Sequence, residues 1–142
     1  MKNVLVIIFC MVSQFSFSQF AKVEIDFKKP ESVVNALIFA ANKSELSILN
    51  CICDPVLEGN DSVKFLKQLK EDGGNAALGN EEAMKRIKIF YDDFIGATIT
   101  GETEYEQQDK YFFFAYIPVS TKSGEVKIKL IKLYDNWYIH EF

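Results

Sequence analysis

The chain has 142 residues, of which 49% are hydrophobic and 14% aromatic, and its formal net charge at neutral pH is −4. This length suits one domain with a hydrophobic core and not two. A net negative charge without a Lys/Arg cluster argues against nucleic acid or an anionic membrane surface as a partner.

The first eighteen residues have the order of a secretory signal peptide. Lys2 gives a positive start, the apolar run Val4–Val12 follows, and a small-polar stretch ends the segment. Ser16 and Ser18 stand at the positions that a signal peptidase recognises. The apolar run is shorter than the roughly 20 residues that cross a bilayer. We therefore expect export to the periplasm or the extracellular space, and release without a membrane anchor.

Cysteine use in the chain is sparse. Cys10 lies in the signal segment, after bulky apolar residues where a lipoprotein signal has small ones. The mature chain of 124 residues, with a net charge of −5 because Lys2 is lost, keeps Cys51 and Cys53. We expect buried free thiols, with a local disulfide and redox or metal chemistry as open alternatives. With His140 as the only histidine, a zinc site lacks a second pair of ligands, and we expect no metal or cofactor.

The mature chain begins with a helical half. Residues 20–27 alternate weakly and predict either a short strand or an unstructured arm within 19–29. Pro30 suits the first position of a helix, and Glu31 suits the positive end of its dipole. The apolar positions that follow fall on one helical face; they are Val33, Val34, Leu37, Ile38 and Ala41.

Two shorter helices are predicted next. Asn42 with Glu45 indicates a capping pair that opens the second helix. Asp61 or Ser62 can cap the third, which Gly73-Gly74 ends.

A mobile loop over 73–80 is expected to precede the clearest helix of the chain. Asn80 caps this helix, and the acidic residues after it favour a helix start. Its apolar stripe steps by three, four and three residues; the stripe is Met84, Ile87, Tyr91 and Phe94, with Ala83 and Phe90 beside it.

From residue 97 the hydrophobic period changes to two, which predicts strands. The expected strands are 97–106, 110–119, 125–134 and 137–142. Glu102, Glu104 and Glu106 share one face of the first strand, and we expect that face to be solvated. Helices followed by an antiparallel meander predict a single α+β domain over 30–142, with the helices covering one face of the sheet.

Four local motifs carry a family resemblance. They are Pro30–Val34, Asn42–Glu45, Ile99–Glu102 and Leu133–Ile139. With them the chain resembles the nuclear-transport-factor-2-like, or cystatin-like cone, superfamily, and within it small exported bacterial domains. The resemblance covers about 29–142 and implies a strongly curved sheet whose concave side, roofed by helices, encloses an apolar pocket. Because this superfamily includes isomerases, dehydratases, epoxide hydrolases and non-catalytic binders, the fold alone does not select a function.

The aromatic side chains supply the candidates for the wall of this pocket. The set is Phe90, Phe94, Phe112, Phe114, Tyr116 and Trp137. The second strand is apolar on both faces, and the sequence does not decide which face packs under the helices.

Three titratable residues are the candidates for proton transfer. His140 is the only side chain whose ordinary pKa lies near neutrality. It alternates with Tyr138 and lies opposite Trp137, and the resemblance implies that it lies on the surface or in an oligomer interface. Asp92 and Asp93 lie near the end of the long helix, and we expect them to be solvated or to cap a turn.

The function favoured by the sequence is a non-catalytic binding module for a small apolar ligand or a peptide. Aromatic excess and the lack of a reactive residue set support it. One alternative is a small isomerase, dehydratase or hydrolase that uses a pocket carboxylate or histidine. The other is a structural subunit that dimerises through its sheet.

Overall fold

The computed structural model describes residues 24–56 and 64–142. The predicted signal segment and the first residues of the arm lie outside these ranges, as do Asp61 and Ser62. The elements are α2 (Pro30–Lys43), α3 (Ile48–Ile52), α4 (Lys64–Ala77), α5 (Glu81–Phe94), β1 (Thr98–Ile99), β2 (Glu104–Gln107), β3 (Phe113–Thr121), β4 (Gly124–Leu133) and β5 (Asn136–Glu141). The described part of the arm, 24–29, forms no strand.

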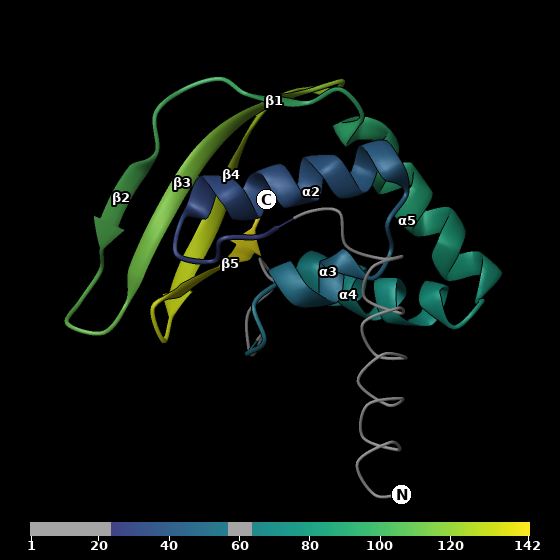
Figure 1. Ribbon diagram of the computed structural model, residues 1–142, viewed down its shortest axis with the longest axis horizontal. Helices are drawn as coiled ribbons and strands as arrows, with labels where there is room; N and C mark the ends of the chain where they lie inside the picture. Colours follow the sequence, from purple (N-terminus) through teal and green to yellow (C-terminus); the bar gives the residue numbers. More distant parts are fainter. Residues whose placement is uncertain (1–23, 57–63) are drawn as a thin grey trace, which may run out of the picture.

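The five strands form one antiparallel sheet in the order β1-β3-β4-β5, with β2 also paired to β3. In Figure 1 the helices lie on one side of this sheet, and the long strands β3 and β4 bend around them. The predicted α+β class, with N-terminal helices packed on an antiparallel sheet, is confirmed.

The single strand expected over 97–106 is wrong, because the structure divides it into β1 and β2. Ile99 pairs with Val119, whereas Glu104 pairs with Tyr116. The chain therefore advances five residues from β1 to β2 while β3 advances three. Gly101 lies in the gap, where an added Cβ would be 2.9 Å from the ring of Pro118. The extra residues between Ile99 and Glu104 form a bulge opposite Pro118.

The side chains of β3 settle which of its faces is turned to the helices. Ala115, Ile117 and Val119 are fully buried, and their cross-strand neighbours Ile128 and Leu130 are buried with them. Phe113 belongs to this helix-facing set by alternation. Phe114 and Tyr116 therefore lie on the opposite, outer face of the sheet.

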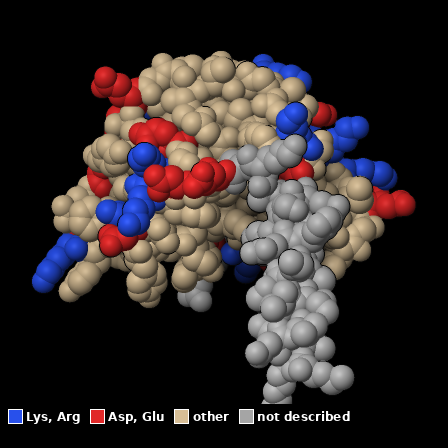
Figure 2. Space-filling view, in the orientation of Figure 1, with Lys and Arg blue, Asp and Glu red and all other residues tan. Residues whose placement is uncertain are grey.

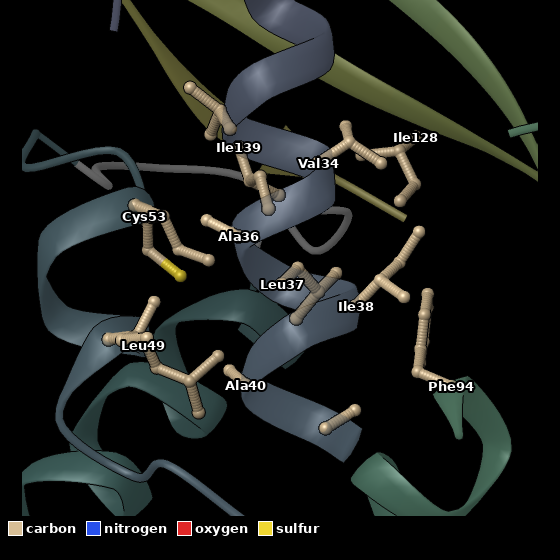
Figure 3. Packing of buried hydrophobic residues seen from close by; sticks show 14 of the residues in the cluster. Val34, Ala36, Leu37, Ile38, Ala40, Leu49, Cys53, Phe94, Ile128 and Ile139 are labelled. Atoms are coloured by element: carbon tan, nitrogen blue, oxygen red, sulfur yellow. The ribbon is translucent and has the colours of Figure 1, made fainter. Parts of the chain in front are cut away.

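The core is organised around α2. Its predicted stripe is confirmed, since all five of its residues are buried. In Figure 3 Val34 lies beside Ile128 of β4, and Ile38 points toward Phe94 of α5. Leu49 and Cys53 approach the other side of the helix from α3.

The capping pair predicted at 42–45 is wrong. The first helix continues to Lys43 and ends at Ser44, whose φ of 56° is left-handed. The Asn42 side chain instead accepts a hydrogen bond from the backbone N–H of Gly96, at 3.0 Å. The short second helix begins only at Ile48.

Gly73-Gly74 does not end the third helix, because α4 runs through both glycines to Ala77. The predicted mobile loop over 73–80 is therefore wrong for its first half. A Cβ at Gly73 would lie 3.3 Å from the Cβ of Leu49, so the missing side chain lets α4 approach α3 closely. Packing overrides the low helix propensity of glycine here.

The long helix begins as predicted at Asn80, whose side-chain oxygen accepts the N–H of Ala83 at 3.0 Å. Ala83, Ile87, Tyr91 and Phe94 are buried. Met84 is exposed and does not belong to the buried stripe.

A charged fork joins α4 to α5. Arg86 donates from Nε and Nη2 to the two oxygens of Asp72, at 2.8 and 2.7 Å, and Gln68 adds a third hydrogen bond at 3.1 Å. The Asp72 carboxylate is buried, whereas the guanidinium is half exposed. The hydrogen bonds from Arg86, opposed by burial, lower the pKa of Asp72.

This fork gives the acid stability a testable source. Because the pKa of Asp72 is lower in the folded state, its contribution is present above its unfolded value of about 3.9 and lost as pH falls below it. We expect Asp72→Asn to be less stable at pH 7. We also expect its unfolding free energy to fall less steeply between about pH 5 and 2, by a slope that corresponds to at most about one bound proton. Urea titrations across this range measure the slope. If the unfolding free energies of the two proteins fell with the same slope against pH, the lowered pKa of Asp72 in the folded state would be contradicted.

The two glycines of α4 give opposite expectations. Gly73→Leu should cost about 1–3 kcal/mol of unfolding free energy, because the new side chain must displace Leu49. Gly74→Ala meets only the Asn50 side chain, at 3.5 Å, and should gain about 0.5–1 kcal/mol from helix propensity. Urea denaturation of both variants measures this. A chain whose helix ended at these glycines would show neither effect.

Candidate functional site

Among the grooves that described residues line, four have volumes of about 400, 570, 270 and 520 Å³. The first lies beside Pro55 and α4, the second between α2 and α5, and the third between α4 and α5. The fourth lies on the strands alone. We call it the aromatic groove; its lining is Tyr105, Glu106, Gln107, Phe113, Phe114, Lys132 and Trp137.

The aromatic groove is built on one row of side chains that crosses four strands. Gln107 pairs with Phe113, and Lys132 pairs with Trp137. The β3–β4 register places Phe113 and Lys132 side by side. Tyr105 leans over this row, with its ring centroid 6.0 Å from that of Trp137.

The helices stop at the edge of this row. The next row inward, Ala115, Leu130 and Ile139, is fully buried. The N–H of Trp137 donates to the carbonyl of Phe27 at 2.7 Å, just before α2 begins. In Figure 1 the end of the sheet that carries β2 and the β4–β5 turn extends beyond the helical layer. Five of the seven lining residues of the aromatic groove therefore belong to the helix-facing side, at the margin of the helical layer, whereas Glu106 and Phe114 belong to the outer-face set.

Aromatic side chains around the groove are open to solvent. Tyr105 is 65% exposed and Phe113 is 39% exposed. Tyr111 and Phe112 precede β3, and Tyr134 stands in the β4–β5 turn, all exposed. Monomeric proteins seldom leave such a gathering of apolar groups uncovered without an interaction that uses it.

Tyr134 is held in an unfavourable backbone conformation. Its φ is 50°, and that of Asp135 is 67°, as in a two-residue hairpin turn. A bulky residue with positive φ costs about 1–2 kcal/mol, and glycine or asparagine is usual there. Such strain concentrates at functional sites. Here it presents a fully exposed tyrosine ring at the end of the sheet that carries the groove.

The structure does not bring the six predicted wall residues together. Phe114 and Trp137 line the aromatic groove, and Phe90 lines the groove between α4 and α5. Phe94 is buried and packs on Phe90, with ring centroids 4.9 Å apart. Phe112, one residue before β3, lines none of the four grooves.

Tyr116, the sixth of these residues, lies on the outer face of the sheet. Its hydroxyl donates to Glu106 at 2.6 Å, and this hydrogen bond to a carboxylate raises the pKa of Tyr116 to about 12. The Lys129 ammonium lies 5.7 Å from its ring and 4.3 Å from that of Phe114. Tyr116 is therefore a structural side chain of the outer face.

Tyr105, Phe113 and Lys132 line the groove and were not predicted. The sequence contains the signal for Phe113, because it alternates with Ala115 in the predicted strand. It does not reveal which set faces the helices, since both sets are apolar. The position of Tyr105 could not be predicted, because the sequence pattern indicates one continuous strand over 97–106 and the structure divides it.

His140 has a partner that the sequence did not suggest. Its Nδ1 lies 2.9 Å from Oδ2 of Asp54, 86 residues away. The Asp54 carboxylate is only 2% exposed and the imidazole 24% exposed. Asp54 is also held by its own N–H, which donates to Ile139 at 2.8 Å, and by the N–H of Val56, which donates to Oδ1. The pair ties the end of α3 to β5, and His140 lines none of the four grooves.

The two acidic candidates of α5 are separated. Asp93 accepts the N–H and the hydroxyl of Ser123, at 2.8 and 2.6 Å, and so caps the β3–β4 turn. The Ser123 hydroxyl contributes most to lowering the pKa of Asp93. Asp92 is exposed and lines the groove between α2 and α5.

The two cysteines in the described part of the chain, Cys51 and Cys53, are free, but only one is buried. The expected burial is wrong for Cys51, which is exposed. Burial raises the pKa of the Cys53 thiol to about 12, so it stays protonated. Within the two described ranges, no group of three or more His, Cys, Asp and Glu side chains is placed to hold a metal ion.

Comparison with protein-family models and with curated proteins finds no match for this chain. Among the described residues, no helix is long and apolar enough to cross a membrane. On the face shown in Figure 2, acidic and basic side chains are interspersed. The arrangement of the site is therefore the basis for any inference about function.

The Asp54–His140 pair makes a prediction about stability. His140→Ala leaves a buried carboxylate oxygen without its partner and should cost about 1–3 kcal/mol. Removing both partners should cost less than the sum of the two single substitutions, because no unpaired buried group is left. Urea denaturation of the single variants and the Asp54→Ala/His140→Ala variant measures the coupling. Strict additivity would show that the two side chains do not interact.

Proposed function

We propose that this chain is an exported, non-catalytic binding module that holds an apolar or aromatic group of a peptide or small amphipathic ligand in the aromatic groove. One observation carries the proposal: the exposed Tyr105 and Phe113 and the buried Trp137 line a groove of about 520 Å³ at the margin of the helical layer. Export rests on the signal pattern of Met1–Ser18.

The lining suits an amphipathic occupant. Aromatic rings supply large apolar contact areas and preferred stacking geometries. Lys132 lies with its ammonium 5.9 Å from the Trp137 ring and adds a positive group beside this wall. Three of the seven lining residues, Glu106, Gln107 and Lys132, are polar, so the groove suits an occupant that presents polar groups beside its apolar part.

The resemblance to the nuclear-transport-factor-2-like superfamily supports the same location. In that fold the ligand lies on the concave, helix-facing side of the sheet. The aromatic groove lies on the helix-facing side, at the end that would be the mouth of the cone. We keep the superfamily assignment as part of the proposal.

The geometry favours binding over catalysis. A general acid or base must reach the reacting group by a hydrogen bond. His140 is hydrogen-bonded to Asp54 and lines none of the four grooves, although its ring lies 5.9 Å from that of Phe114, and Asp93 is engaged in a turn. Glu106 lines the aromatic groove, but its carboxylate accepts the Tyr116 hydroxyl on the outer face.

Anilinonaphthalene sulfonate, an apolar anion whose fluorescence rises on apolar protein surfaces, is a suitable probe. Trp137 is the only tryptophan, so energy transfer from it to the dye reports dye bound to the protein, and the variants locate the site. We expect Phe113→Ala to weaken this binding about fivefold to tenfold, because it removes one wall.

Phe112→Ala is the matched control, since it removes an exposed phenylalanine one residue away that does not line the groove. We expect it to leave dye affinity within about twofold. Equal losses in the two variants would contradict the proposed site. A loss only in Met84→Ala would move the site to the groove between α2 and α5.

A further inference from the structure

The two edges of the sheet differ in how they are covered. Beside β5, Cys53 forms a parallel bridge to Ile139, and the carbonyl of Phe27 accepts the Trp137 N–H. At the other edge, β2 pairs with β3 alone, and all four of its residues are exposed. The edge formed by β2 adjoins the aromatic groove, because Tyr105 and Gln107 belong to both.

The hydrogen-bond pattern shows which backbone groups of β2 point outward. The N–H of Gln108 donates to Phe112 at 3.0 Å, which makes this a hydrogen-bonded pair of the antiparallel ladder. Such pairs alternate, so Glu104 and Glu106 bond to β3. The N–H and C=O groups of Tyr105 and Gln107 therefore face away from the sheet. An edge of this kind can accept an added strand.

The side chains of β2 divide between the two faces. Tyr105 and Gln107 lie on the groove side, whereas Glu104 and Glu106 lie with Tyr116 on the outer face. Glu102 precedes the strand and is exposed, with no ion pair inside the described parts of the chain. A strand added beside β2 would place alternate side chains against these two different surfaces.

Charge decides between a second copy and another partner. Two β2 edges paired antiparallel would bring Glu104 and Glu106 against the same residues of the copy, and like charges opposite each other are destabilising. Lys127 neutralises only Glu104, at 2.9 Å, and the chain carries a net charge of −4. Acidic side chains therefore protect this edge against self-association and favour a basic partner.

We propose that the occupant of the site is an extended segment of another polypeptide, with alternating basic and apolar residues, that adds to β2 as a further strand. Its backbone pairs with Tyr105 and Gln107. Its apolar side chains enter the aromatic groove beside Trp137, and its basic side chains lie along Glu102 and Glu106. This inference rests on the proposed function and specifies the partner.

A ten-residue peptide of alternating lysine and valine, capped at both ends and labelled with a fluorophore, is the probe. Its affinity for the purified protein is measured by fluorescence anisotropy. Two N-methylated versions are compared, one methylated at every lysine and one at every valine. In an added strand only one of these sets has its N–H groups toward β2. We expect one version to bind at least about tenfold more weakly and the other to change less than about twofold.

Glu102→Lys tests the charge requirement without altering the groove. We expect it to weaken the lysine–valine peptide about threefold to tenfold and to strengthen a glutamate–valine peptide. Binding of anilinonaphthalene sulfonate, an anion, should not weaken, because Glu102 does not line the groove and the substitution replaces a negative charge near it by a positive one.

The outcomes separate this inference from the proposed function. Equal effects of the two methylated versions, or no binding of any peptide, would overturn strand addition. Equal affinity for lysine–valine and glutamate–valine peptides would overturn the basic partner. The dye experiment with Phe113→Ala decides separately whether the groove binds apolar groups.

Discussion

The packing of α2 against the sheet is the constraint on which the rest of the structure depends. Its apolar stripe fills the space between β4, α3 and α5, and Val33, Val34 and Leu37 are fully buried. The carbonyl of Phe27 accepts the Trp137 N–H, and Glu31 accepts the hydroxyl of Thr103. These contacts fix where the helix begins, and so which rows of the sheet are dry.

One consequence is that the margin of the helical layer determines both features of the proposed site, the aromatic groove and the open edge of β2. Inside it, small and aliphatic side chains pack under helices. At the margin lies the buried Trp137, and beyond it the same face continues as Lys132 and the exposed Phe113, beside a strand with an open edge. The strained turn at Tyr134 adds another exposed ring at this end. Burial of this surface by a partner would offset the cost of leaving it exposed.

Local periodicity predicted the elements that depend on local rules. Pro30 and the stripe of α2, the Asn80 cap and the change of period after residue 96 each act within a few residues. The errors come from contacts between distant segments. Gly73 stays helical because Leu49 lies against it, and the strand breaks at Gly101 because Pro118 crosses there. Asp54 meets His140 only in the folded chain, and the inward face of β3 depends on where the helices lie.

The most direct measurement of the central claim is the solvent exposure of individual aromatic rings in solution. Ring resonances of the purified protein are followed by NMR while a soluble gadolinium chelate is added. We expect the resonances of Phe113 and Tyr105 to broaden strongly and those of Phe94, under the helical layer, to be protected. If Phe113 were protected as well as Phe94, the helices would cover the groove and the proposed site would not exist.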